Sequence, residues 1–232
     1  MDNTLHTDFT QRIVVHSQQT PWLDSPMVGV KRRPLERYGQ EIARATSIVQ
    51  YAAGSQFSPH CHLGGEEFYV LEGVFQDEHG DYPAGSYIRN PPHSSHTPFS
   101  TKGCRIFVKL WQIPDHDQRT VTLTPSTYPL ATEHHGITEH LLYHAAYETV
   151  SLQIWPADKH ISMAAPNGLE LLVLSGQLHS EQDTLQQGSW LRLPCGATFT
   201  AYSQAAKTTI WLKQHHLNRV EQEIVRLRSH IS

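Results

Sequence analysis

The sequence predicts an all-β protein made of two tandem β modules followed by a short C-terminal helix. Three observations predict this fold class. Short runs rich in β-branched and aromatic residues recur between turn-forming residues, the second half repeats turn positions of the first, and one amphipathic segment closes the chain. Many short strands at this spacing are typical of a sandwich or a barrel.

Seven segments have the composition of strands, and turn chemistry separates them, as in DEHGDYPAGS at 77–86 and PNG at 166–168. The predicted strands are RIVVHS (12–17), TSIVQY (46–51), EFYVLEGVF (67–75), RIFVKLWQ (105–112), TVSLQIW (149–155), LELLVLSGQL (169–178) and TTIWLKQ (208–214). The helix is expected in NRVEQEIVRLRSHIS, at 218–232, where one apolar stripe is formed by Val220, Ile224, Leu227 and Ile231.

An offset of 103 residues aligns the two halves of the chain. It carries Gly73 onto Gly176, Gly85 onto Gly188, Arg89 onto Arg192 and Pro91 onto Pro194. Because glycine and proline mark turns, the repeat preserves backbone geometry first. We therefore predict a first module over residues 1–115 with core motifs at 44–112, a second module over 116–216 and the helix over 217–232.

Composition and charge exclude several classes of protein. The chain has 232 residues and a formal net charge of −4, and its densest basic stretch, KRRPLER at 31–37, is expected to be a solvated loop, so nucleic-acid binding is not expected. No apolar run approaches the roughly 20 residues of a membrane helix, and the N-terminal MDNTLHTDFTQR lacks the apolar core of a signal peptide. Three cysteines without a C-x-x-C pair indicate reduced thiols. We expect a cytoplasmic protein.

The stretch HCHLGGEEFYVLEG, residues 60–73, carries the most specific chemistry. In an extended strand, residues i and i+2 face the same side, so His60 and His62 can point together into a barrel. Glu66, after a Leu-Gly-Gly turn, can return along the neighbouring strand, and His96 in NPPHSSHTPF is the candidate for a fourth ligand. Three imidazoles and one carboxylate suit a divalent ion such as Fe(II), Mn(II), Ni(II) or Zn(II).

Two neighbouring residues compete for these roles, Glu67 with Glu66 and His93 with His96. Alternation along the strand places Phe68 and Val70 on the face of Glu66 and turns Glu67 away, which favours Glu66.

The repeat does not extend to this chemistry. At the same offset, the four candidate ligands fall on Met163, Ala165, Leu169 and Phe199. We therefore expect a metal site in the first module and a filled apolar interior in the second. Lys109, Trp111 and Arg89 lie on strands that can approach the site, but a wall or surface role is the simpler interpretation.

The spacing of these residues resembles that of a known family. The first cupin motif is matched by Gly54, His60-x-His62, Glu66 and Gly73, and the second by Gly85, Pro91 and His96, with His93 in place of the usual glycine and Ser100 in place of the usual asparagine. The longer sequence around these motifs, residues 28–113, is similar to the cupin domain of ChrR-type anti-sigma factors. The resemblance implies two double-stranded β-helix (jelly-roll) domains and a metal, zinc in the type member, held by His60, His62, Glu66 and His96.

The resemblance also implies a role. We expect a metal-binding bicupin that acts as a regulatory or sensor module in the response to oxidative or singlet-oxygen stress, with a small-molecule ligand or effector in the N-terminal barrel. Binding of a sigma factor is not expected, because no cysteine precedes Cys61 to form the N-terminal zinc domain of that family.

Two further readings stay open. The alternative is an Fe(II)-dependent dioxygenase that acts on a small aromatic ketone or a related compound, so the sequence leaves enzymatic activity undecided. A structural or storage bicupin is the third reading, and the intact ligand set argues against it. A homodimer is compatible with the sequence.

Overall fold

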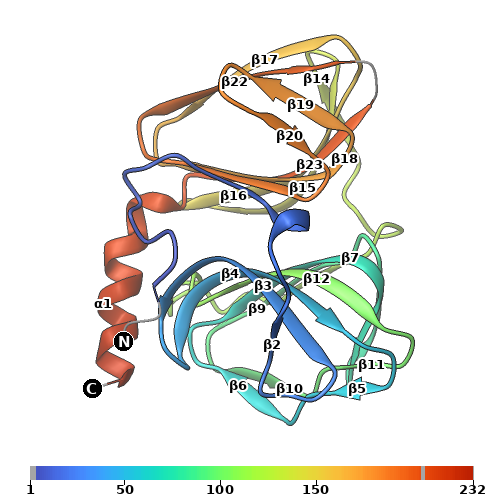
Figure 1. The fold of residues 1–232 in the computed structure, drawn as a ribbon, viewed down its shortest axis with the longest axis vertical. Helices are drawn as coiled ribbons and strands as arrows, with labels where there is room; N and C mark the ends of the chain where they lie inside the picture. Colours follow the sequence, from blue (N-terminus) through green and yellow to red (C-terminus); the bar gives the residue numbers. More distant parts are fainter. Residues whose placement is uncertain (1–3, 205–206, 232) are drawn as a thin grey trace. The chain divides into compact units, whose positions relative to one another are not determined.

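The computed structural model describes residues 4–204 and 207–231, which fold into two compact units (Figure 1). The first module consists of residues 21–127 together with 4–7 and 221–231, and the second module consists of residues 8–20 and 128–220. The predicted boundaries treat each module as one continuous segment, whereas here each module takes one segment from the opposite end of the chain. The two modules are described separately below.

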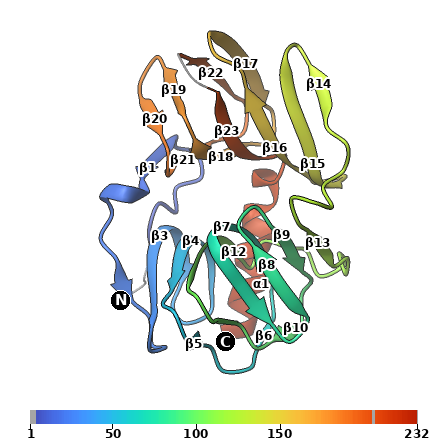
Figure 2. The same ribbon diagram turned by 90° about the vertical axis from the view of Figure 1, so that its right-hand side faces the viewer.

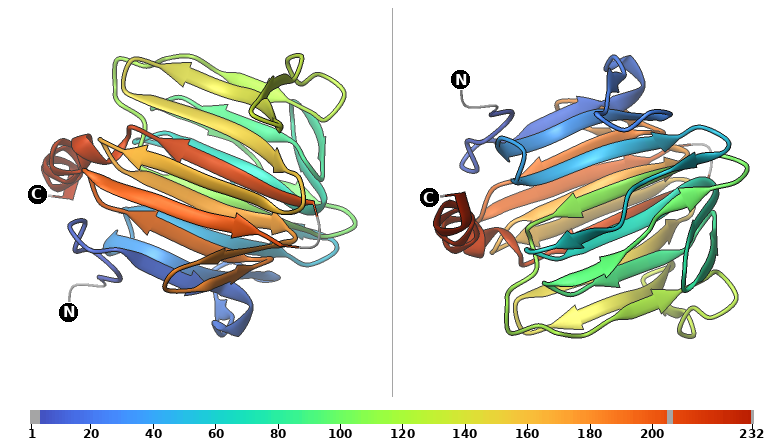
Figure 3. Two further views of the ribbon diagram at one scale, coloured as in Figure 1. Left: turned by 90° about the horizontal axis from the view of Figure 1, so that it is seen from above. Right: turned by 90° about the horizontal axis from the view of Figure 1, so that it is seen from below.

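The first module is built on a large antiparallel sheet whose main strand order is β13-β9-β7-β12-β4-β3-β2, with β5, β8 and β11 attached (Figure 3, right). A separate two-stranded sheet pairs β10 with β6. The strands are β2 (Leu23–Asp24), β3 (Val30–Gly39), β4 (Ala43–Tyr51), β5 (Ser55–Gln56), β6 (His60–His62), β7 (Glu66–Asp77), β8 (Gly80–Pro83), β9 (Tyr87–Asn90), β10 (Ser94–His96), β11 (Phe99–Ser100), β12 (Cys104–Leu110) and β13 (Val121–Leu123).

Alternation along these strands separates an interior face from an exterior one. Phe68, Val70, Ile106 and Val108 belong to one buried cluster, and register pairs Phe68 with Val108 and Val70 with Ile106. Side chains two residues apart on a strand share a face, so this cluster fixes which residues of β7 and β12 point inward.

The second module has a seven-stranded sheet in the order β1-β21-β18-β23-β16-β15-β14 and a four-stranded sheet in the order β17-β22-β19-β20 (Figures 2 and 3). Its strands are β1 (Ile13–His16), β14 (Thr132–His134), β15 (Ile137–Ala145), β16 (Glu148–Trp155), β17 (Lys159–Ala165), β18 (Leu169–Ser175), β19 (Gln177–Ser180), β20 (Thr184–Gln186), β21 (Ser189–Leu193), β22 (Ala197–Ser203) and β23 (Thr208–Gln214). Strand β1 precedes the main segment of the first module, residues 21–127, in sequence, yet it pairs with β21 from Ile13 opposite Arg192 to His16 opposite Ser189.

The interior of the second module is filled by apolar side chains. Fourteen buried residues form one cluster that includes Trp155, Leu171, Leu191 and Ile210, each no more than 1 % exposed. Burying such side chains contributes about 1.5–3 kcal/mol each, so the interior of this module is stabilised by apolar packing.

Helix α1 (Val220–Ile231) begins two residues after the predicted start, behind a 3₁₀ turn at Leu217–Arg219, and belongs to the first module. The apolar stripe is the packing face: Leu227 is fully buried and Ile224 is half-buried. Ser232 and the side chain of Ile231, both part of the predicted helix, lie outside the described residues. Among the helices described, none is long and apolar enough to cross a membrane.

All seven segments predicted as strands contain strands, with 169–178 divided between β18 and β19, and the predicted all-β fold class is confirmed. The basic stretch at 31–37 was expected to be a solvated loop, and this is wrong, because it forms the centre of β3. Pro34 sits where the register between β3 and β4 shifts, between Pro34 and Glu36. A bulge tolerates a proline inside a strand, and this explains why the sequence signal was misleading.

Candidate metal centre

Three histidines meet because two short strands pair. Strands β6 and β10 run antiparallel, with His96 opposite His60 and Ser94 opposite His62. One ligand atom from each of His60, His62 and His96 lies within 4.8 Å of the other two, and the Nε2 atoms of His62 and His96 are 2.9 Å apart. Within the part of the chain that the structure describes, these three histidines form a group of ligands close enough together to hold one metal ion.

Glu66 brings a carboxylate to the same point. It is the first residue of β7, directly after Gly65, which adopts a φ of 75° where an added Cβ would lie 2.9 Å from Ile113. The Oε2 atom of Glu66 is 3.4 Å from Nε2 of His62 and 3.5 Å from Nε2 of His96. The amide of Asn90 donates to the same oxygen at 3.2 Å, which fixes the carboxylate.

These separations fit donors around one ion. Nitrogen and carboxylate ligands lie about 2.0–2.2 Å from a divalent metal such as zinc, so two neighbouring donors are roughly 2.8–3.6 Å apart for angles between octahedral and tetrahedral values. The distances between Glu66, His62 and His96 agree with that spacing. These three donors therefore fit one divalent metal, and His60, whose ligand atom lies within 4.8 Å of the other two histidines, can complete the set.

Hydrogen bonds behind the histidines set their tautomers. Nδ1 of His60 lies 2.9 Å from the carbonyl oxygen of Ser58, and Nδ1 of His96 lies 3.2 Å from Oδ2 of Asp77. Both partners accept, so in the neutral rings each Nδ1 carries the proton and each Nε2 keeps its lone pair for a ligand. Metal-binding histidines usually have such a partner, because it orients the ring and raises its basicity.

Asp77, which sequence reasoning missed, is held in place by several donors. The Tyr82 hydroxyl donates to it at 3.0 Å and the backbone N–H of His79 at 2.9 Å. Burial opposes ionisation, but the hydrogen bonds from His96, His79 and Tyr82 outweigh it and hold the pKa of Asp77 below its usual value. Asp77 is the last residue of β7, eleven residues after Glu66, and no local pattern in the sequence marks it.

The pKa values of His62 and His96 are shifted in opposite directions. Burial is the main cause that lowers the pKa of His62, which favours the neutral ring that binds metals. Burial also acts to lower the pKa of His96, but the hydrogen bond to Asp77 and the nearby charges of Glu66 and Asp77 reverse this and raise it.

The two alternative ligands lie away from this point. Glu67 accepts a hydrogen bond from the Tyr87 hydroxyl at 2.6 Å and lies 3.9 Å from Arg89, on the opposite face of the sheet from Glu66. His93 is exposed in the turn before β10 and has a φ of 68°.

A cavity of about 770 Å³ opens beside the histidines, inside the first module. Its wall is mostly apolar, with Val49, Ile106, Val108 and Leu110 among the lining residues, and His60, His62 and Glu66 also line it. Arg32 and Arg37 of β3 add two guanidinium groups. The sequence did not predict that these two arginines line a cavity, because the bulge at Pro34 interrupts the alternation of inward- and outward-facing residues along β3.

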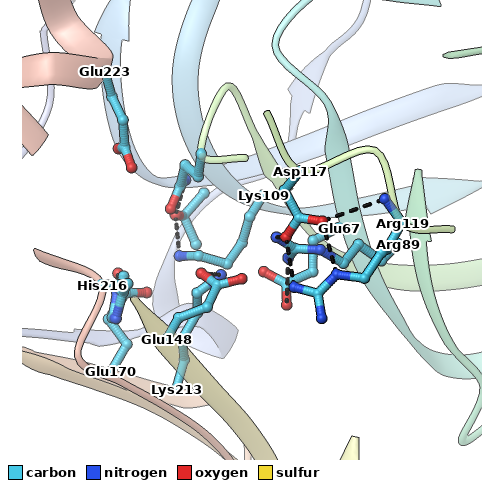
Figure 4. Close-up of polar contacts among 12 residues, drawn as sticks. Glu67, Arg89, Lys109, Asp117, Arg119, Glu148, Glu170, Lys213, His216 and Glu223 are labelled. Atoms are coloured by element: carbon cyan, nitrogen blue, oxygen red, sulfur yellow. Dashed lines mark hydrogen bonds and ion pairs between the residues drawn. The ribbon is translucent and has the colours of Figure 1, made fainter. Parts of the chain in front are cut away.

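The three residues that the sequence placed on strands near the site, Lys109, Trp111 and Arg89, do not all face the cavity. Trp111 lines the cavity, whereas Lys109 donates to the hydroxyl of Thr46 at 2.9 Å and lies opposite Glu67 in register. Arg89 is fully buried and lies 3.4 Å from Asp117 (Figure 4).

The second module keeps the strand register and replaces the ligands. Met163 pairs with Phe199 as His60 pairs with His96, and Ala165, Leu169 and Phe199 are all in the apolar core. Among the four equivalents, Met163 alone is only partly buried, packed against that core.

The outer faces of the two large sheets, by contrast, carry the same polar arrangement. In the second module Trp190 donates to Glu170 at 3.1 Å, and Arg192 and Lys213 flank Glu170 in register, as Arg89 and Lys109 flank Glu67 in the first. Lys213 also forms an ion pair with Glu148 at 2.8 Å (Figure 4).

Comparison with known proteins finds a family similarity over most of the first module and over residues 10–20 of the second. Residues 10–114 match the family model of the ChrR cupin-like domain. No curated protein matches the chain.

Solved structures support the fold over most of the chain. A putative dioxygenase from Nostoc punctiforme is 12 % identical, with a TM-score of 0.72 over 90 % of this chain and 84 % of that one. Protein Ylba from E. coli is 14 % identical, with a TM-score of 0.68 over 89 % and 91 %. The bacterial pirin YhhW from Escherichia coli, in complex with nickel(II), is 13 % identical, with a TM-score of 0.63 over 88 % and 98 %. The protein therefore has the cupin fold, and residues 10–114 are similar to the ChrR cupin-like domain.

Proposed function

We propose that the protein is a metal-binding bicupin in which His60, His62, Glu66 and His96 hold one divalent ion, with zinc as the native metal. The observation that carries this proposal is the convergence of these four side chains at distances suited to one ion, at the edge of a cavity. A bound metal would supply Lewis acidity and open coordination positions for a ligand in the cavity.

The chain's own residues account for the remaining chemistry. Asp77 and the Ser58 carbonyl orient the rings of His96 and His60, and Asn90 orients the carboxylate of Glu66. The apolar wall excludes water from a ligand, which strengthens its polar contacts with the site.

We propose a regulatory or sensor role, in which ligand binding or oxidation at the site changes an interaction with a protein partner. The match of residues 10–114 to the ChrR cupin-like domain supports a link to oxidative or singlet-oxygen stress. Glu67 and His93 are the ionisable side chains next in sequence to the site that could act as a general base, and neither lines the cavity, which favours binding over acid–base catalysis.

The alternative is an Fe(II)-dependent dioxygenase for a small aromatic ketone. The observation that favours it is the cavity, whose volume of about 770 Å³ and apolar wall can accept a ring beside the metal ligands. The similarity in fold to a putative dioxygenase supports the same reading.

The identity of the metal and the presence of turnover distinguish the two roles. Protein purified anaerobically without added metal is analysed for its elements, and oxygen uptake is measured with a panel of aromatic ketones. Zinc near one equivalent without oxygen uptake supports the sensor. Iron or manganese at that level together with oxygen uptake would overturn the sensor role in favour of the oxygenase.

A further inference from the structure

The cavity has a second polar group that the metal site does not use. Arg32 and Arg37 line it from strand β3, where register places them opposite Val49 and Ala45, two residues that also line it. Arg33, between them in sequence, is absent from the lining and stacks on Trp22 at 4.1 Å. Both cavity-lining arginines therefore belong to the inward face of the sheet.

These two guanidinium groups lack an acidic partner in the described parts of the chain. Arg32 donates to the hydroxyl of Ser25 at 2.8 Å and Arg37 donates to the backbone carbonyl of Gln40. The Nε atom of each is buried without a hydrogen-bond partner among the described residues. Burial is the main cause that lowers the pKa of both side chains, which reflects a cationic group that nothing acidic compensates.

The charge of the lining favours an anion. Apart from the histidines, its ionisable residues include Arg32, Arg37, Glu66 and Glu41, and Glu41 is exposed. A divalent ion at Glu66 would leave an excess of positive charge around an otherwise apolar space. Both arginines are half-buried, and desolvating a cation without an acidic partner is costly, so an anionic ligand would lower that cost.

The layout of the sheet sets the size of the ligand. Arg37, Ala45, Leu110 and Glu66 form one row across strands β3, β4, β12 and β7. Three strand spacings separate Glu66 from Arg37, about 14 Å along the sheet. Arg37 and Glu66 therefore stand at opposite ends of this row, an arrangement that suits a ligand with an apolar body between two polar ends.

We propose that the cavity binds a small carboxylate with an apolar body, its carboxylate on Arg32 and Arg37 and a second oxygen, such as a ketone, toward the metal ligands. The inference rests on the proposed metal site for its second end. The guanidinium end selects the charge of the ligand, and the apolar wall formed by Val49, Ile106 and Val108 accepts the body.

The test uses the full chain loaded with zinc and two matched probes, para-acetylbenzoate and its uncharged amide, para-acetylbenzamide. Calorimetric titration should give at least about tenfold tighter binding for the acid, because hydrogen bonds to a charged group are stronger than neutral ones. Arg32→Gln and Arg37→Gln should each weaken binding of the acid by about 10- to 100-fold and leave the amide unaffected. Arg32→Lys, which keeps the charge, should retain part of the affinity.

Arg33→Gln is the matched control, because Arg33 lies on the same strand outside the lining. Equal binding of acid and amide, or an equal effect of Arg33→Gln and Arg32→Gln, would overturn the carboxylate inference. If the chain keeps one equivalent of zinc in that case, the proposed metal function stands. Failure to bind zinc at all would instead overturn the proposed function and the metal end of this inference with it.

Discussion

The interiors of the two modules share one backbone plan and differ in chemistry. Where His60 pairs with His96 in the first module, Met163 pairs with Phe199 in the second. Leu169, in the place of Glu66, is fully buried in an apolar core, while the first module has a cavity of about 770 Å³ at its ligand residues. The fold therefore does not require polar side chains in its interior. In the first module, polar side chains and a cavity replace part of the apolar packing seen in the second.

The outer faces show the opposite pattern. Glu67 with Tyr87 and Arg89 in the first module corresponds to Glu170 with Trp190 and Arg192 in the second. A polar arrangement that survives in both modules serves the architecture they share. Side chains that differ between the modules, the four ligand candidates, are those expected to carry function.

The largest predicted effect is the loss of the aromatic ring in the second module. Phe199→Ala removes a side chain that is 2 % exposed in the apolar core, and should lower the free energy of unfolding by about 3–5 kcal/mol. Urea denaturation with and without chelator measures this. A loss that depends on the chelator would contradict the comparison, since this interior is expected to be independent of metal.

Removal of metal should affect the first module alone. At a free zinc concentration 100-fold above the dissociation constant, binding stabilises the folded state by about 2.7 kcal/mol. Hydrogen exchange after chelation should therefore increase in peptides from β6 and β10, and peptides from β17 and β22 should not change. The same chelator should leave exchange in His96→Ala unaltered. Equal changes in both sets of peptides would show that the metal is not specific to the first module.

The hydrogen bond from His96 to Asp77 should be measurable in metal affinity. Asp77→Asn should weaken zinc binding by about 10- to 100-fold, because the partner that orients the ring is lost or weakened. Competition with a chromophoric chelator gives the affinity. Asp158→Asn is the matched control, because Asp158 accepts from the Tyr202 hydroxyl in the second module at 2.7 Å, much as Asp77 accepts from Tyr82. A similar loss of affinity in both variants would rule out a specific role for Asp77.

The smallest predicted effect concerns one turn. His93 has a φ of 68°, and the residue at the equivalent position of the second module is Gly196, with a φ of 82°. A side chain in this left-handed region is strained, so His93→Gly should raise the free energy of unfolding by about 1 kcal/mol and leave the metal content unchanged. Thermal unfolding and elemental analysis test both parts. Loss of metal in His93→Gly would contradict this prediction and indicate that His93 is a metal ligand.

Much of this arrangement could be predicted from the sequence, because it depends on local alternation. Period-two reasoning placed Phe68 and Val70 with Glu66 and turned Glu67 away, and the strand register agrees. The offset of 103 residues identified the apolar equivalents of the ligands, and three of the four belong to the buried core.

The features that were not predicted depend on contacts distant in sequence or on irregular backbone. Pro34 and its bulge concealed strand β3, and with it the arginines of the cavity. Asp77 reaches His96 across nineteen residues of chain. Strand β1 joins β21, which lies more than 170 residues later, and no local pattern reports such a pairing.

The central claim is that one module holds a metal through His60, His62, Glu66 and His96, and that its repeat does not. The most direct measurement is the metal content per chain of the wild type, His60→Ala, His96→Ala and Met163→Ala, each prepared and dialysed identically. The account predicts about one equivalent in the wild type and in Met163→Ala, and almost none in the two histidine variants. Retention of the metal in both histidine variants would contradict it.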